Sequence, residues 1–228
     1  MAGILLRVAT VASVNVSAVK TFAVGERKIR SAILKAPVAG RVMVRALGVD
    51  GDAQADHRFH GGPDKAVYLY GAEHYDFWRS RIRGRALDHL ANLPFGSFGE
   101  NLTVAGFGDL EANLHVGDML RTSDAMIELT DPRQPCWKLE TRFAIKDFAR
   151  AFLGSGRIGV YSRVRQEGLV GAGDAVEVVE RAPDSITLAD LILALYFRDD
   201  AARARALAST SLPAKLRRRI ERQEPEGE

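Results

Sequence analysis

The stretch 125-AMIELTDPRQPCWKLE-140 joins an expected strand, a stiff turn and an expected helix, and it contains the only cysteine of the chain, Cys136. Residues 125–130 have the composition of a short β-strand. Pro132 and Pro135 fix their own φ angles and keep the residues before them extended. The stretch therefore predicts that the thiol lies on a stiff approach to a helix that begins near Trp137.

Short β-type runs like this one make up most of the chain as far as residue 182. Gly, Asp and Pro separate them, which suits a barrel or sandwich better than a parallel sheet with long crossover helices. The other expected strands cover residues 4–11, 41–47, 101–106, 114–123, 159–168 and 175–182. We therefore predict an α+β fold, mainly β, built as a barrel or a sandwich with flanking helices.

Two helices are expected within this region, over residues 64–82 and 137–153, because aromatic residues recur there at helical spacing. After residue 182 the composition shifts to Ala, Leu and Arg, which predicts three short helices at 187–196, 199–208 and 213–222, the first behind a Ser185 or Thr187 cap. The expected organisation is a barrel domain over 1–182, a three-helix extension over 183–223 and a disordered tail over 224–228.

Composition excludes several classes of protein. With 46% hydrophobic residues in 228, the chain can build a sizeable core, and its single cysteine cannot form an internal disulfide. No stretch approaches the roughly 20 apolar residues that cross a bilayer. The formal charge of +3 is too small to indicate nucleic-acid binding. We expect a cytoplasmic protein with neither a membrane nor a nucleic acid as partner.

The densest polar segment is 48-GVDGDAQADHRFHGGPDK-65. One interpretation is a metal site at residues 56–60, although the spacing of His57 and His60 matches no strong ligand motif. A second is an anion site, in which the backbone N–H groups of 60-HGG-62 act beside His60 and Lys65. A third is a solvated loop. A second glycine-rich loop, 94-PFGSFGENLTV-104, places Asn101 where its amide can recognise a ring edge or simply form a turn.

The chemistry of Cys136 also allows two interpretations. A lone cysteine is commonly a small buried hydrophobe. At a helix start, however, with Arg133 and Lys138 nearby in the sequence, the thiol would lose its proton more readily and act as a nucleophile or a soft metal ligand. The residues alone do not decide between these interpretations.

Seven motifs in order resemble the MOSC domain proteins, specifically the YiiM group: 31-SAILKAPV-38, 48-GVDGDAQAD-56, 60-HGGPDKAVYLY-70, 74-HYDFW-78, 98-FGENLTV-104, 117-GD-118 and 132-PRQPCWKL-139. The C-terminal helices resemble the three-helix extension of that group. The resemblance implies a MOSC β-barrel that binds the molybdenum cofactor, a pterin with a dithiolene and a phosphate. It gives no reason to expect pyridoxal phosphate.

The resemblance also implies roles for individual residues. Cys136 would be the ligand to molybdenum and would form a catalytic group with Arg133 and Lys35. Arg133 suits an anionic oxygen, and Lys35 offers a compact positive charge or a proton. The alternative for each is that it is simply a charged side chain on the solvated surface, with no role in a site. The cofactor would be held by the family motif positions His60, Gly61, Gly62, Asn101 and Arg133, with Lys65 ranked lower.

The activity implied is the reduction of N-hydroxylated bases such as 6-hydroxylaminopurine to amines. A separate reductase protein would supply electrons, because the sequence has no flavin-binding or iron–sulfur motif. By the same resemblance a homodimer is expected. Two alternatives remain open: a sulfur carrier or cofactor-handling protein that uses a Cys136 persulfide, and a non-enzymatic pterin or base-binding module.

Overall fold

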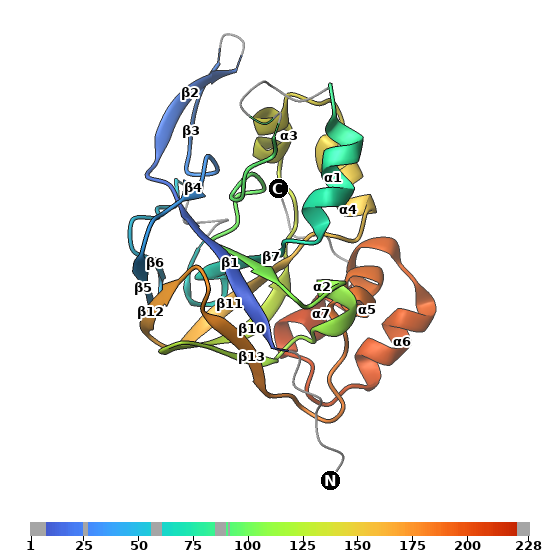
Figure 1. Cartoon of the computed structure of the whole chain (residues 1–228). Coiled ribbons are helices and arrows are strands. Elements are labelled where there is room, and N and C mark those ends of the chain that lie inside the picture. Colours follow the sequence, from blue (N-terminus) through green and yellow to red (C-terminus); the bar gives the residue numbers. More distant parts are fainter. Residues whose placement is uncertain (1–7, 25–26, 56–60, 85–89, 91, 223–228) are drawn as a thin grey trace.

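A closed barrel forms the centre of the molecule (Figure 1). The computed structural model describes residues 8–24, 27–55, 61–84, 90 and 92–222. Neighbours are antiparallel except for the parallel pair β7–β8, and pairing of β1 with β13 closes the ring. The strands around the ring are β13 (Ala175–Glu180), β9 (Met119–Thr122), β10 (Ala125–Pro132), β11 (Val160–Gln166), β7 (Val67–Gly71), β8 (Leu102–Ala105) and β1 (Ala9–Val16). The predicted fold class is confirmed.

Alternation along the strands explains why these residues form a barrel. In β10, Ala125, Ile127 and Leu129 are buried while the residues between them are partly exposed. Successive side chains of a strand point to opposite faces, so one set fills the interior. In contrast, all five residues of β7 are buried, because helices cover this strand on its outer side.

Smaller sheets flank the barrel. β5 (Arg41–Arg45) pairs with β12 (Gly168–Gly171) and β6 (Gly48–Val49), and β4 (Ala36–Pro37) pairs with the end of β1. The hairpin of β2 (Lys20–Val24) and β3 (Arg27–Ser31) projects away from the body (Figure 1). This hairpin is not among the expected strands.

Helices α1 (His74–Ile82), α3 (Trp137–Phe143) and α4 (Phe148–Gly154) build a second, aromatic core against β7, around Tyr70, Phe98 and Phe152. The expected helix over 64–82 is wrong in its first half, which forms the turn η1 (Pro63–Lys65) and strand β7. The expected helix over 137–153 is split. Ala144 and Asp147 both take left-handed φ angles, 54° and 59°, and end the regular hydrogen bonding.

The C-terminal region contains helices where the sequence predicts them, at α5 (Leu188–Ile192), continued by the π-helical turn η3 (Leu193–Phe197), α6 (Asp200–Ala208) and α7 (Ala214–Arg222). The predicted cap at Thr187 is confirmed, since its side chain accepts a hydrogen bond from the Asp190 N–H at 3.0 Å. These helices lie beside the barrel and the short helix α2 (Leu110–Asn113) (Figure 1).

Apolar side chains join the extension to the barrel, because Leu188, Leu191, Leu216 and Ile220 belong to the same buried cluster as the strand residue Leu129. The division into domains at residue 182 stays a prediction. The expected tail at 224–228 and the first residues of the expected strand at 4–11 lie outside the described residues. No helix in the described part of the chain is long and apolar enough to cross a membrane.

The barrel interior should dominate stability. Leu120 of β9 is fully buried, so Leu120→Ala is expected to lower the free energy of unfolding by about 2–5 kcal/mol through lost contacts and a cavity. The same substitution at Leu47, which is 63% exposed, should change it by about 0.5 kcal/mol or less. Urea unfolding of both variants measures the difference. Equal losses in the two variants would contradict this placement of the core.

Candidate functional site

A single pocket collects most of the candidate residues. Of the predicted set, it is lined by Lys35, Gly61, Lys65, Asn101, Arg133 and Cys136. These residues come from segments far apart in the sequence, so the barrel and its flanking sheets bring them together. Gly62 lies next to the lining residue Gly61, and His60 lies outside the described residues.

Cys136 lies between strand β10 and helix α3, as the sequence predicts. It immediately precedes the helix in an extended conformation (φ −111°, ψ 166°), and its carbonyl accepts a hydrogen bond from the Leu139 N–H at 2.9 Å. The residue is partly exposed and lines the pocket. It is therefore accessible, and the interpretation as a buried filler does not fit its position. Its role as a metal ligand stays a prediction.

Arg133 is only 5% exposed, which excludes its interpretation as solvated surface. Its Nη1 donates to the Phe98 carbonyl at 2.6 Å and to the Tyr68 hydroxyl at 3.4 Å. Its guanidinium lies 4.8 Å from the centroid of the Tyr68 ring. Burial alone lowers the pKa of Arg133, but Tyr68, Tyr161 and Cys136 outweigh it and the pKa is raised, so the positive charge is held permanently beside the thiol.

Lys35 is paired with Asp52, a residue that the sequence analysis did not single out. The Lys35 ammonium contacts the Asp52 carboxylate, and their side chains are 8% and 4% exposed. Asp52 also accepts hydrogen bonds from the Ser17 N–H and the Asn101 amide, each at 2.9 Å. Burial lowers the pKa of Lys35, and the attraction of Asp52 opposes but does not cancel it. Lys35 is thus a buried cation that gives up its proton more readily than a surface lysine.

Asn101 lines the pocket, but its amide is engaged within the protein. Its Nδ2 donates to Asp52, and its Oδ1 accepts from the Tyr68 N–H at 3.2 Å. Both ends of the amide therefore tie the second glycine-rich loop to its neighbours. This arrangement favours a role in holding Asp52 and Tyr68 over direct recognition of a ring edge.

Glu100, before Asn101, organises that loop. Its fully buried carboxylate accepts hydrogen bonds from the Gly96 N–H at 2.8 Å, the Phe98 N–H at 3.1 Å and the Thr103 hydroxyl at 2.9 Å, and it also contacts the Tyr75 hydroxyl. The Phe98 carbonyl in turn accepts the hydrogen bond from Arg133. By holding the loop that carries Phe98, the Glu100 carboxylate therefore also holds the acceptor of Arg133 in place.

Gly61, from the 60-HGG-62 motif, lines the pocket. Gly61 and Gly62 have φ angles of +88° and +82°, which favour glycine. A Cβ on Gly61 would also lie 2.3 Å from the amide oxygen of the flexible Gln54 side chain, which would have to move aside. Lys65 follows on η1, with its ammonium 5.5 Å from the centroid of the Tyr161 ring. The anion interpretation of this segment stays a prediction, and residues 56–60, on which the metal interpretation rests, lie outside the described residues.

Two tyrosines complete the site and were missed as site residues. Tyr68 and Tyr161 face each other with ring centroids 5.3 Å apart, and both line the pocket. Burial raises the pKa of both hydroxyls, so both stay protonated at neutral pH. Tyr68 lies in the segment 64–82, for which the sequence predicts a helix, and it is not among the residues of the predicted helical stripe. In strand β7 its side chain faces Arg133 instead.

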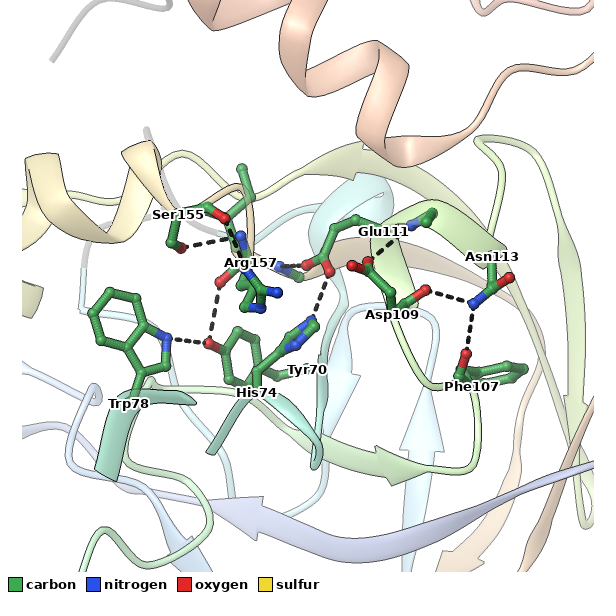
Figure 2. A network of polar contacts seen from close by, with 12 residues as sticks. Tyr70, His74, Trp78, Phe107, Asp109, Glu111, Asn113, Ser155 and Arg157 are labelled. Atoms are coloured by element: carbon green, nitrogen blue, oxygen red, sulfur yellow. Dashed lines mark hydrogen bonds and ion pairs between the residues drawn. The ribbon is translucent and has the colours of Figure 1, made fainter. Parts of the chain in front are cut away.

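A separate buried network, centred on Glu111, is connected to the site through the backbone of Gly159 (Figure 2). His74 of α1 contacts the Glu111 carboxylate of α2 at 2.6 Å, and Glu111 also accepts from the Gly159 N–H at 2.7 Å. The Gly159 carbonyl in turn accepts from the Arg133 N–H at 3.1 Å. The network therefore fixes the backbone against which Arg133 is placed.

The pocket as a whole is positively charged. Of the described residues that line it, Lys35, Lys65, Arg133 and Lys138 are cationic and only Asp52 carries a carboxylate. Within the same described part of the chain, no three His, Cys, Asp or Glu side chains gather to hold a metal ion. The arrangement thus offers one soft sulfur donor, an excess of positive charge and two aromatic faces to a ligand.

Comparison with known proteins gives consistent matches. A model of the MOSC domain matches residues 56–177. The chain is 39% identical to an uncharacterised Bacillus subtilis protein, YflK, over 179 residues, 78% of this chain and 77% of the relative. It is 39% identical to protein YiiM of Escherichia coli over 154 residues, 68% of this chain and 66% of the relative. It is 34% identical to a reductase of Gibberella moniliformis over 161 residues, 68% of this chain but only 26% of that longer protein.

Solved structures agree with these matches. The crystal structure of YiiM from Geobacillus stearothermophilus superposes with a TM-score of 0.72 at 29% identity, covering 94% of this chain and 98% of the other. The crystal structure of YiiM from Escherichia coli superposes with a TM-score of 0.68 at 27% identity, covering 97% of this chain and 92% of the other. The likeness thus includes the C-terminal helices as well as the barrel.

The lowered pKa of Lys35 makes its contribution to stability depend on pH. Below that pKa both the folded and unfolded chains carry the proton, so the contribution is constant. Between the lowered value and the ordinary value of about 10.4, the unfolded chain binds more protons, so stability rises with pH. We expect the free energy of unfolding of the wild type, relative to Lys35→Met, to increase over this alkaline window.

Urea unfolding of both proteins at a series of alkaline pH values measures this trend. Lys146→Met, which removes an exposed lysine between α3 and α4, controls for the general loss of one positive charge. If the free energy of unfolding of wild type minus that of Lys35→Met stays constant or falls as the pH rises, Lys35 does not have a lowered pKa.

Proposed function

The chain belongs to the MOSC domain family, and on this premise we propose that it is an oxidoreductase that holds the molybdenum cofactor in the Cys136 pocket and reduces N-hydroxylated bases to amines. The observation that carries the proposal is the placement of an accessible thiol beside the buried cations Lys35 and Arg133 in one pocket. 6-Hydroxylaminopurine is the substrate we expect. The name of the Gibberella moniliformis relative, a reductase, supports a redox role.

The residues present fit this cofactor. A phosphate and an anionic dithiolene need positive charge, and the pocket supplies four cations against one carboxylate. A metal that already has sulfur donors from its own ligand needs few from the protein, and Cys136 is a soft donor of the suitable kind. Gly61 allows close approach of backbone at positive φ, as anion-binding turns require.

In this proposal Cys136 is the protein's ligand to molybdenum, and Arg133 orients an anionic oxygen. Arg133 suits this task because its contacts with Phe98 and Tyr68 fix the guanidinium plane before a ligand arrives. Gly61, Lys65 and Lys138 would hold the phosphate. Gly62 and His60, in the same motif, are kept as proposed neighbours of the cofactor.

Lys35 would provide a proton to the departing oxygen. Reduction of a hydroxylamine, R–NH–OH + 2 e⁻ + 2 H⁺ → R–NH₂ + H₂O, breaks the N–O bond and consumes two protons. When bound, the cofactor would supply a redox-active metal centre that delivers the two electrons. Asp52 holds the Lys35 ammonium in the pocket, and burial makes its proton easier to release. The pair is therefore arranged for general acid catalysis.

The electrons would come from a separate reductase protein. In that scheme, electrons would pass from the partner's redox centre to the pocket through the protein surface near Cys136. The exposed Trp137 beside the thiol, 57% accessible, provides a contact point there. A homodimer remains a proposal from resemblance alone.

The cofactor assignment is tested by elemental analysis. Wild type produced in cells that make the cofactor is expected to contain about one molybdenum per chain, and Cys136→Ser to lose most of it, because an alcohol is a much poorer donor to a soft metal. Trp137→Phe, a neighbouring change that leaves the thiol, should retain the metal. Metal-free wild type carrying a persulfide on Cys136 would favour the sulfur-carrier function instead.

The proton role of Lys35 is tested by turnover. With 6-hydroxylaminopurine and an artificial electron donor, loaded Lys35→Met should be about 10²- to 10⁴-fold slower than wild type, the usual size of a general acid effect. Lys146→Met should match wild type. If Lys35→Met retains molybdenum and full activity, another group donates the proton. If loaded wild type shows no turnover at all, the binding-module alternative gains support.

A further inference from the structure

We propose that Arg219, on the last C-terminal helix, is a positioning residue for the Cys136 loop and acts through an ion pair with Asp131. The proposal assigns a task to the C-terminal extension, and its relevance to catalysis rests on the proposed function of Cys136. According to this proposal, the C-terminal extension restrains residues 133–136, the Cys136 loop, in addition to packing against the barrel.

The ion pair is buried. Arg219 Nη1 donates to both carboxylate oxygens of Asp131, each at 2.9 Å, and the two side chains are 10% and 7% exposed. Arg219 Nη2 also donates to the Tyr196 hydroxyl of η3 at 3.3 Å. The guanidinium therefore connects three elements: α7, η3 and the end of β10.

Asp131 occupies the point where β10 becomes the Cys136 loop. It lies two residues before Arg133 and five before Cys136, and residues 133–136 have no regular secondary structure. The register of β10 against β11 shifts between Leu129 and Asp131, and Asp131 then pairs with the pocket residue Tyr161. Such bulges redirect a strand locally and recur beside active sites. A restraint on Asp131 is thus transmitted through a short segment to the thiol.

The position of Arg219 is itself fixed by packing. Leu216 and Ile220, on the same helix, are 2% exposed and belong to the barrel's core cluster. The ion pair between Arg205 and Asp190 provides a contrast, because it joins α6 to α5 within the extension and its side chains are 52% and 26% exposed. Arg219 reaches outside the extension to the loop, whereas Arg205 does not.

The energetics of buried ion pairs agree with a positioning role. Taking two charges out of water costs about as much as their attraction returns, so such a pair adds little net stability. Removing one partner takes away the opposite charge that offsets the burial of the other, and a shift of the loop relieves that cost. The pair therefore favours one loop arrangement over others.

The test measures the reactivity of Cys136, which is the only thiol in the chain and so is labelled specifically. The full-length proteins are produced in cells that do not make the molybdenum cofactor and are alkylated with iodoacetamide well below their unfolding midpoints. Arg219→Ala and Asp131→Asn are each expected to change the alkylation rate by at least about threefold, a size typical of directly coupled residues. The double variant should fall short of the product of the two single effects. Arg205→Ala should react like wild type.

Several outcomes would overturn the proposal: unchanged alkylation in folded Arg219→Ala, an equal change in Arg205→Ala, or strictly multiplicative effects of Arg219→Ala and Asp131→Asn. If Arg219→Ala does not fold, Asp131→Asn and Arg219→Lys carry the same test, and wild-type rates in both would overturn it. Molybdenum content is measured separately on cofactor-loaded protein. Because alkylation does not depend on metal, a failure of the proposed function is distinguished from a failure of this inference.

Discussion

Closure of the barrel through β1 and β13 is the constraint on which the rest of the structure depends. The two strands meet at two residue pairs, Ala9 with Val176 and Thr10 with Ala175. Backbone hydrogen bonds from the Val11 N–H to Asp174 and from the Gly173 N–H to Val11, at 2.9 and 2.8 Å, continue the contact into the turn. A closed sheet has no edge along which strands can slide, so the segments that leave its strands start from fixed positions. The pocket is assembled from such segments.

Burial of charge gives the pocket its chemical character. Water would screen the cations at an open surface, but Lys35 and Arg133 are largely removed from it, so their fields act strongly within the pocket. The two are held differently. Lys35 is paired with a carboxylate and its pKa is lowered by burial, whereas Arg133 contacts a carbonyl and aromatic rings and its pKa is raised. One cation is thereby suited to exchanging a proton and the other to keeping a permanent charge.

The sequence predicts the repeated local features and misses those set by distant partners. The β pattern, the strand-to-helix junction at Cys136 and the Thr187 cap depend on neighbours within a few residues, and all three are confirmed. Strand β7 was misread as helix because all five of its residues are buried, so no alternation marks it. Asp52 was one of four aspartates in a polar loop, and only the fold selects it as the partner of Lys35. Motif resemblance placed Lys35, Arg133 and Cys136 in one site, which spacing alone does not show.

The thiol is held from both sides, and this explains how a loop without regular structure can carry a site. Upstream, the Arg133 N–H bonds to Gly159 and its guanidinium to the Phe98 carbonyl, and these two acceptors are fixed in turn by Glu111 and Glu100. Downstream, Leu139 and Phe143 of α3 are fully buried in the aromatic core. Between these anchors lie only Gln134 and Pro135 before Cys136, and the proline removes one of the few remaining rotations. Pro135, one of the two prolines that predict a stiff approach from the sequence, therefore has a defined task in the structure, because it lies between the two fixed points and leaves the sulfur little freedom to move. Pro132 ends strand β10, before the first of these points.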